Sequence, residues 1–441
     1  MVTSRSRRAL FALVVVCCFS APAQWQDVHG NLPIWGVGSA IAACDSLVAV
    51  VAIGTGPPHT IYLTTDGGHF WSNRSIPYYW GAVDVSLMDS SHIWATTDSG
   101  AIYGSTDGGR SWVLQFSDTT KTVFMNYVKM FDIQNGIAMG DGNSSLLPAI
   151  FLRTFDGGKH WVSVNDSAFG AWSGDVWRRL DFPSPTVGYF YESGFTPQKM
   201  YRTSDGCAHW KALGFPDSLY VMALRFADEE TGLVFGAVWR NVNNSLIQFN
   251  YVARTGDGGT SWEVFPSPAT GWGNSFGFSP GNPARAWMTD NLKLYFSADT
   301  GRTWTQQLSF GGRDIAFTDL YHGWMLGDNG TLYYTATGGQ GPAASVTVRS
   351  PNTVAGFALS QNYPNPFNPT TTIRVELPRA SQVNLSVCDV LGREVCVLIN
   401  ERRDAGVYEV RFDGSNLASG VYFYRLTAGD NAASKKMIVV R

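Results

Sequence analysis

One octapeptide recurs along the chain and decides its fold: it reads TTDGGHFW at 64–71 and STDGGRSW at 105–112. It returns as TFDGGKHW from Thr154, TSDGCAHW from Thr203, TGDGGTSW from Thr255 and SADTGRTW from Ser297. A degenerate copy, TATGGQGP from Thr335, lacks both the aspartate and the tryptophan. The copies recur about every 40 to 50 residues, which is the length of a four-stranded propeller blade. The spacing predicts an all-β, seven-bladed β-propeller, with six or eight blades as the alternatives.

The residues of each copy suit a tight turn between the third and fourth strands of a blade. Glycine supplies the positive φ of such a turn, and the aspartate and serine or threonine can bond its amides. The tryptophan covers the turn and buries a large apolar area. We expect structural roles for the aspartates and tryptophans of the six complete copies: Asp66, Asp107, Asp156, Asp205, Asp257 and Asp299, with Trp71, Trp112, Trp161, Trp210, Trp262 and Trp304.

The pattern [ST]-x-D-[GT]-[GC]-x-x-W resembles the Asp-box (BNR repeat) of sialidases, sortilins, xyloglucanases and photosystem II assembly-factor propellers. That resemblance implies an outward structural turn and not a catalytic site. It identifies a fold class and leaves the function open. The segment Trp25-Gln26-Asp27-Val28 is similar to the residues that follow a box, so we expect it to supply the fourth strand of the last blade and to close the ring.

The first 23 residues have the features of a secretory signal peptide. Arg5, Arg7 and Arg8 precede an apolar run from Ala9 to Phe19, and Ala21-Pro22-Ala23 offers a small-residue cleavage site. No later apolar run is long enough for a transmembrane helix. The predicted organisation is a signal peptide over 1–23, the propeller over 24–340, a Pro- and Gly-rich linker over 341–357 and a second module over 358–441.

The second module shows short alternating strands that predict a small Ig-like β-sandwich. Its motifs resemble the type A C-terminal sorting domain of the type IX secretion system: NYPNPFNP at 362–369, DVLGREV at 389–395, LASGVYFY at 417–424 and KKMIVV at 435–440. The resemblance implies that the type IX machinery is a partner. It also implies a secreted or outer-surface location in a Gram-negative bacterium, with the module acting as a sorting signal.

The cysteines leave one disulfide undecided and suggest no metal site. Cys388 and Cys396 flank the turn at Leu391-Gly392. A three-residue loop would bring them together across a hairpin, and a two-residue loop would point them to opposite faces. Because no C-x-x-C pair or histidine–cysteine cluster is present, we expect no metal and no cofactor.

The charge balance excludes some partners. Only 15% of residues are charged and the net charge is −3, so nothing favours nucleic acid. We expect a monomer without a transmembrane helix, whose ligand is a surface glycan or a protein.

Two sets of residues are candidates for a site. The first strands of a propeller line its central channel and alternate residues of a strand share a face, so six charged residues are expected near the axis. They are Asp84, Lys129, Arg179, Asp181, Arg225 and Asp314, and they form either a ligand site or a self-satisfied ion-pair network between blades. The second set is aromatic, and suits sugar or protein recognition unless it belongs to the core: Tyr78, Tyr79, Trp80, Trp172, Trp177 and Trp272.

The predicted function is therefore a secreted or cell-surface binding module without catalytic activity. The alternative is an extracellular glycoside hydrolase, which would need a pair of carboxylates in the channel, drawn from Asp84, Asp181 and Asp314. A sialidase is disfavoured, because Leu32-Pro33-Ile34 lacks the arginine of the Arg-Ile-Pro segment typical of that family.

Overall fold

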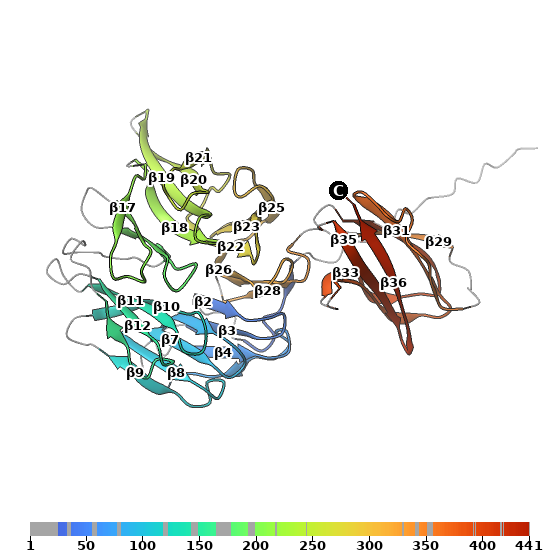
Figure 1. Ribbon diagram of the computed structural model, residues 1–441, viewed down its shortest axis with the longest axis horizontal. Helices are drawn as coiled ribbons and strands as arrows, with labels where there is room; N and C mark the ends of the chain where they lie inside the picture. The colour runs from blue at the N-terminus through green and yellow to red at the C-terminus, as the bar shows by residue number, and fades with distance from the viewer. Residues whose placement is uncertain are drawn as a thin grey trace, which may run out of the picture.

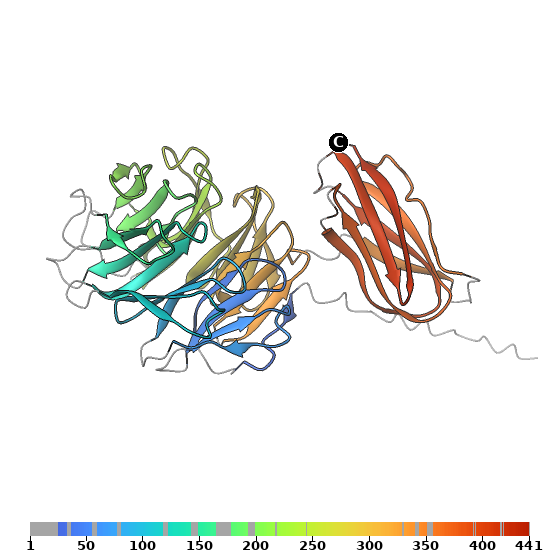
Figure 2. The ribbon, with the colours of Figure 1, turned by 60° about the horizontal axis from the view of Figure 1, so that its bottom comes forward.

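The computed structural model describes residues 25–440 apart from 33–36, 55–59, 77–80, 118–121, 143–148, 165–177, 193–198, 217, 244, 329, 340–343, 351–355, 391, 393, 415–416 and 418. The predicted signal peptide therefore lies outside the described residues. Those residues form nine four-stranded antiparallel sheets, which confirms the all-β prediction. Seven sheets come from residues 26–335 and gather into one body, and two more form a second body, red in Figures 1 and 2.

Each of the seven sheets is a blade, and its strands pair in chain order. Blades one to three are β2 (Val37–Ala43), β3 (Ala49–Gly54), β4 (Thr60–Thr64), β5 (Ser72–Asn73); β6 (Ala82–Leu87), β7 (Ile93–Thr97), β8 (Ala101–Ser105), β9 (Val113–Ser117); and β10 (Thr122–Met130), β11 (Gly136–Gly142), β12 (Ile150–Thr154), β13 (Val162–Ser163). Blades four to six are β14 (Leu180–Asp181), β15 (Gly188–Glu192), β16 (Lys199–Thr203), β17 (Lys211–Leu213); β18 (Tyr220–Phe226), β19 (Gly232–Val242), β20 (Ser245–Thr255), β21 (Glu263–Pro266); and β22 (Gly273–Ser279), β23 (Asn282–Asp290), β24 (Leu294–Ser297), β25 (Thr305–Leu308). Blade seven is β26 (Gly312–Phe317), β27 (Gly323–Gly327), β28 (Leu332–Thr335) and β1 (Gln26–Asp27).

The two ends of the propeller meet in blade seven. Strand β1 pairs with β28, with Gln26 opposite Tyr334 and Asp27 opposite Tyr333. The first strand of blade seven, β26, also contacts β2 of blade one. The N-terminal segment therefore supplies the fourth strand of the last blade, as its sequence predicts, and the ring closes.

The box turns share one hydrogen-bond pattern. Thr64 donates its hydroxyl to Asp66 Oδ1 at 2.8 Å and accepts the amide of Gly68 at 3.0 Å, while Asp66 Oδ1 accepts the amide of Phe70 at 3.0 Å. The same three bonds recur in the other five boxes. In the second box, the hydroxyl and amide of Ser111 lower the pKa of Asp107 to about 2. The aspartate thus satisfies turn amides, which fits a structural role.

The box tryptophans pack between neighbouring blades. Trp71 meets Trp324 of blade seven edge-on, with ring centroids 6.0 Å apart, and donates its indole N–H to the carbonyl of Val28 at 2.9 Å. Trp112 of blade two likewise donates to the carbonyl of Arg74, which follows blade one, at 2.8 Å. The first two boxes therefore fix their own turns and also attach their blades to the preceding ones.

The seventh box is assembled from both ends of the propeller. Thr335 accepts the amide of Gly339 at 2.8 Å, the bond made by the hydroxyls of the complete boxes. Trp25 precedes β1 as the box tryptophans precede the other fourth strands, and it donates its indole N–H to Gln307 Oε1 at 3.0 Å. Trp161 uses Gln115, three residues after the preceding box tryptophan, in the same way. Trp25 thus takes the place of the tryptophan that the degenerate copy lacks.

The sixth box carries a strained residue. Thr300 occupies the first glycine position of the box with φ of +57°, where a β-branched side chain is disfavoured. We expect Thr300→Gly to raise the free energy of unfolding by about 1 kcal/mol, measured by chemical denaturation. The reverse change at the matching position of the fifth box, Gly258→Thr, should lower it by at least as much. A loss of stability in Thr300→Gly would show that backbone strain does not control this turn.

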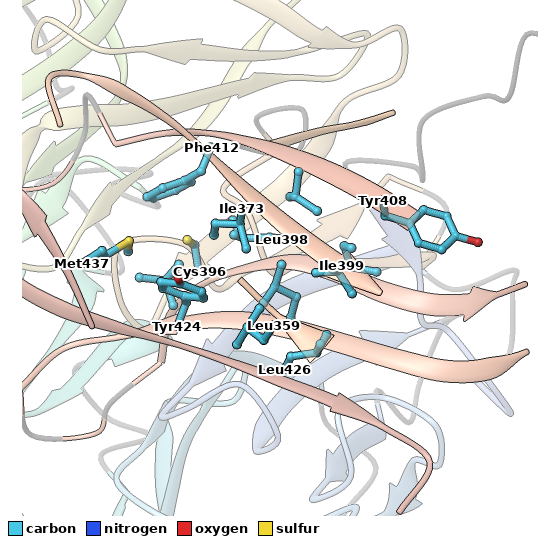
Figure 3. Close-up of a cluster of buried hydrophobic side chains, with 14 of the residues drawn as sticks. Leu359, Ile373, Cys396, Leu398, Ile399, Tyr408, Phe412, Tyr424, Leu426 and Met437 are labelled. Carbon is cyan, nitrogen blue, oxygen red and sulfur yellow. The ribbon is translucent and has the colours of Figure 1, made fainter. Parts of the chain in front are cut away.

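The second body is a sandwich of two sheets. One sheet contains β29 (Ala344–Ser350), β34 (Gly406–Asp413), β31 (Thr370–Leu377) and β30 (Ala358–Leu359). The other contains β33 (Glu394–Arg403), β32 (Ser381–Cys388), β35 (Gly420–Ala428) and β36 (Asn431–Val439). Their inner faces share one apolar cluster, in which Figure 3 shows Ile373 and Phe412 of one sheet with Leu426 and Met437 of the other.

Part of the predicted linker forms a strand. The composition predicts a linker over 341–357, and residues 344–350 within it form β29, which pairs with β34 from Ala344 opposite Phe412 to Ser350 opposite Val407. The strand was not predicted because Pro- and Gly-rich residues flank it at 340–343 and 351–356. Its own sequence, Ala-Ser-Val-Thr-Val-Arg-Ser, alternates over too few residues to give a clear strand signal. The sandwich therefore begins no later than Ala344.

The question of the Cys388–Cys396 disulfide is settled by register. Cys388 lies opposite Glu394, whereas Cys396 lies opposite Val387, with an irregularity between Val387 and Cys388. Cys396 points into the sandwich core (Figure 3), and Cys388 is half-exposed. The two cysteines form no disulfide bond.

Candidate functional site

A cavity of about 400 Å³ lies between the first strands of the blades. Six of these strands pair irregularly with their second strands near the start, between Gly38 and Ala40, Ala82 and Val85, Met125 and Tyr127, Val221 and Ala223, Gly273 and Ser275, and Gly312 and Asp314. Bulges of this kind increase local twist and re-aim side chains. The repeated irregularity therefore determines which polar side chains line the cavity.

Three aspartates join neighbouring blades: Asp84 and Asp314 line the cavity, and Asp181 is buried behind Lys129 and Arg225, which line it. Each accepts a backbone amide from the first strand of the next blade: Asp84 from Val128 at 2.9 Å, Asp181 from Phe226 at 2.8 Å, and Asp314 from Ile41 at 3.1 Å. We call this arrangement, Asp84, Asp181 and Asp314 with their three acceptor bonds, the carboxylate clasps. Each clasp satisfies an amide that the first strand of the next blade presents toward the blade carrying the aspartate.

Two cations surround Asp181. Lys129 Nζ lies 3.4 Å and Arg225 Nη1 3.7 Å from Asp181 Oδ1. The Asp181 side chain is fully buried, while those of Lys129 and Arg225 remain 32% and 41% exposed toward the cavity. Burial alone would raise the pKa of Asp181, but the fields of Lys129 and Arg225 and the Phe226 amide hold it below its usual value. The three predicted residues therefore come together as an ion-pair network between blades three, four and five.

The arginine next to this network is not the predicted one. Arg178, and not Arg179, lines the cavity: it donates to Asp314 Oδ1 at 2.6 Å and to the carbonyl of Ser39 at 2.9 Å. Arg179 instead donates to the Tyr220 hydroxyl at 2.8 Å. The alternation that predicted Arg179 fails because Arg178 has φ of +63° and β14 begins only at Leu180. A left-handed arginine gives no signal in the sequence.

Asp84 stands apart from the other two aspartates because, among the residues that the structure describes, no cation forms an ion pair with it. Burial, with the nearby charge of Asp314, raises its pKa to about 7, and the Val128 amide opposes this rise only in part. The cavity wall therefore contains one carboxyl group with a pKa near neutral, Asp84, and one that is paired with a cation, Asp314, while the ion-paired Asp181 is buried behind the wall.

The predicted aromatic set falls mostly outside the described residues: Tyr78, Tyr79, Trp80, Trp172 and Trp177 do so. Trp272, just before β22, is 57% exposed, and Asn291 Oδ1 accepts its backbone amide at 3.0 Å. Sequence reasoning missed several exposed aromatic residues, among them Trp239 of β19, which lies in the exposed outer half of its strand.

Residues 361–440 match the family model of a secretion system C-terminal sorting domain. This match confirms the predicted sorting domain, so the chain is exported by the type IX secretion system to the cell surface or the extracellular space. Among the described residues, no helix is long and apolar enough to cross a membrane.

The propeller has known relatives in sequence and structure. The photosystem II assembly lipoprotein Ycf48 of Synechococcus sp. strain CC9902 is 22% identical over 314 residues, 66% of this chain and 84% of that protein. The structure of YCF48 bound to D1 peptide covers 72% of this chain and 100% of its own, with a TM-score of 0.56 at 19% identity. The GH74 enzyme of Niastella koreensis covers 95% of this chain and 75% of its own, with a TM-score of 0.52 at 13% identity. At these identities the likeness establishes the propeller fold alone.

Proposed function

We propose that this exported chain is a non-catalytic propeller that binds an extracellular ligand. The observation that supports this function is the engagement of the three clasp carboxylates. Asp84, Asp181 and Asp314 each hold an amide of the next blade, and the last two are also ion-paired. A glycoside hydrolase needs one carboxyl group aimed at the leaving oxygen and another at the sugar or a water. Carboxylates that clasp blades are poorly placed for both tasks.

A hydrolase remains the second candidate, and one observation favours it. The raised pKa of Asp84, about 7, is the property of a general acid, and Asp314 contributes to it. That the charged residues of the channel bind a ligand also stays a prediction. Within the network of Lys129, Asp181 and Arg225, the side chain of Arg225 is the most exposed.

The two functions are separated by one experiment on the purified exported protein. Immobilised glycans and surface proteins are screened for binding, and every glycan that binds is then incubated with the protein and assayed for new reducing ends. We expect retention of a ligand without products. Products that disappear in both Asp84→Asn and Asp314→Asn would replace the binding module with a hydrolase. No retention on any glycan or protein would contradict the proposal.

A further inference from the structure

Blade five carries the two longest strands of the propeller. Strands β19 and β20 pair over eleven positions, from Gly232 opposite Thr255 to Val242 opposite Ser245. Their neighbours end earlier: β18 pairs only as far as Ala237, and β21 only as far as Tyr251. Residues 238–242 and 245–249 therefore form a two-stranded arm beyond the sheet, visible as the yellow-green projection in Figure 1.

The two faces of this arm differ in chemistry, because paired residues share a face and successive residues of a strand point to opposite faces. One face, which we call the Trp239 face, carries Trp239 opposite Gln248 and Asn241 opposite Leu246. On the other face, Arg240 lies over the ring of Phe249 at 5.4 Å and donates to the Tyr251 hydroxyl at 3.2 Å. Each face thus exposes an aromatic ring, Phe249 at 37% and Trp239 at 38%, but the ring on the second face lies under the charged Arg240.

The Trp239 ring is held from one side by an aromatic support. Tyr220 meets it edge-on with ring centroids 5.5 Å apart. Arg179 in turn stacks on Tyr220 at 4.9 Å and donates to its hydroxyl at 2.8 Å. A two-stranded arm is only marginally stable by itself, so these contacts fix an orientation that the strands alone would not.

The amide groups beside Trp239 are fixed in the same way. Gln248 donates to Asn250 Oδ1 at 2.7 Å, and Asn250 donates to the carbonyls of Ala269 at 3.0 Å and Gly271 at 3.1 Å. The carboxamide of Gln248 is thereby oriented next to the Trp239 ring, its partner across the strands. An aromatic platform flanked by positioned amides is a preorganised recognition surface.

From this geometry we infer that the Trp239 face binds a neutral polysaccharide. The apolar face of a pyranose ring stacks on Trp239, and its hydroxyl groups bond to the amides of Gln248 and Asn241. None of Trp239, Asn241, Leu246 and Gln248 is charged, which matches an uncharged sugar polymer and offers nothing to an acidic one. The inference names the ligand class of the binding module proposed above and rests on that proposal.

The test uses affinity electrophoresis of the purified exported protein in gels that contain barley β-glucan, xyloglucan, galactomannan or dextran. We expect at least one polysaccharide to retard the wild-type protein, and Trp239→Ala to weaken the apparent affinity at least about tenfold. Trp239→Phe should retain part of the affinity, and Gln248→Ala should lose part of it. Phe155→Ala removes a more exposed ring, 57% against 38% for Trp239, from the third box turn and should change nothing.

Three results would overturn the inference, and they leave different consequences for the proposed function. Retardation that Trp239→Ala leaves intact moves glycan binding to another surface, and the binding module stands. If none of the four polysaccharides retards the protein, neutral polysaccharides are excluded as the ligand class. The screen of surface proteins then decides whether the propeller is a binding module. A dimer in sedimentation that Trp239→Ala converts to a monomer makes the face a contact between copies. If Trp239→Ala fails to fold, the affinities of Gln248→Ala and Trp239→Phe, which preserve the arm, decide the result.

Discussion

Trp25→Ala is expected to lower the free energy of unfolding by about 3–5 kcal/mol, the cost of removing a fully packed tryptophan. Trp25 is buried against Phe317, with ring centroids 6.1 Å apart, and is bonded to Gln307 of blade six. Its loss leaves a cavity at the junction where the two ends of the ring meet. The measurement is equilibrium unfolding in guanidinium, with the midpoint and the slope both recorded.

Trp272→Ala is the matched control, because it removes the same side chain from an exposed position. Its effect should stay within about 0.5 kcal/mol. If Trp25→Ala is as mild as Trp272→Ala, then Trp25 does not act as the seventh box tryptophan, and the β1–β28 pairing alone closes the ring.

Asp84→Asn is expected to change how stability depends on pH. The pKa of Asp84 is raised from 3.8 to about 7 in the folded protein, chiefly by burial. Between pH 4 and pH 7 the unfolded chain loses this proton while the folded protein keeps it, so the group lowers stability as the pH rises. Asparagine cannot ionise and can still accept the Val128 amide. From pH 4 to pH 8 the variant should therefore gain stability relative to wild type, on the order of 4 kcal/mol.

The comparison is made by urea unfolding at pH 4, 6 and 8. Asp430→Asn removes a carboxylate from a fully exposed position and should leave the pH profile unchanged. A profile of Asp84→Asn that runs parallel to wild type would mean that Asp84 ionises normally and that water reaches it in the folded protein.

Much of the fold was predictable because the propeller repeats itself. The box spacing predicts four-stranded units, and seven four-stranded sheets are present between residues 26 and 335. Trp25 and β1 resemble the tryptophan and fourth strand of the other blades, and this likeness predicts that they complete blade seven. The prediction works because a repeat places equivalent residues in equivalent surroundings. Strand β29 escapes this logic, since it occurs once and lies within a Pro- and Gly-rich stretch.

The site was predictable only where the alternation of strands is regular. Lys129, Asp181 and Arg225 follow the period of two and do meet at the cavity wall. The backbone of Arg178 has a φ of +63°, which no pattern of residue types reveals. Arg178 therefore lines the cavity in place of the predicted Arg179. The arm of blade five was not predictable either. The repeat predicts the part that all blades share and not the extension of two strands in one of them.

The closing strand also determines how the protein carries mechanical load. The chain leaves the propeller after β28 and continues to the sorting domain, and β28 lies between β27 and β1 in its sheet. A surface attachment through the sorting domain and a ligand on the propeller would place tension on β28. That tension is resisted by β27 on one side and by β1 on the other. Trp25, which directly precedes β1, donates a hydrogen bond to Gln307 of blade six, 282 positions away. The pull is thus distributed into blade six and blade seven together, and an outward pull on the tether does not peel an edge strand from the ring.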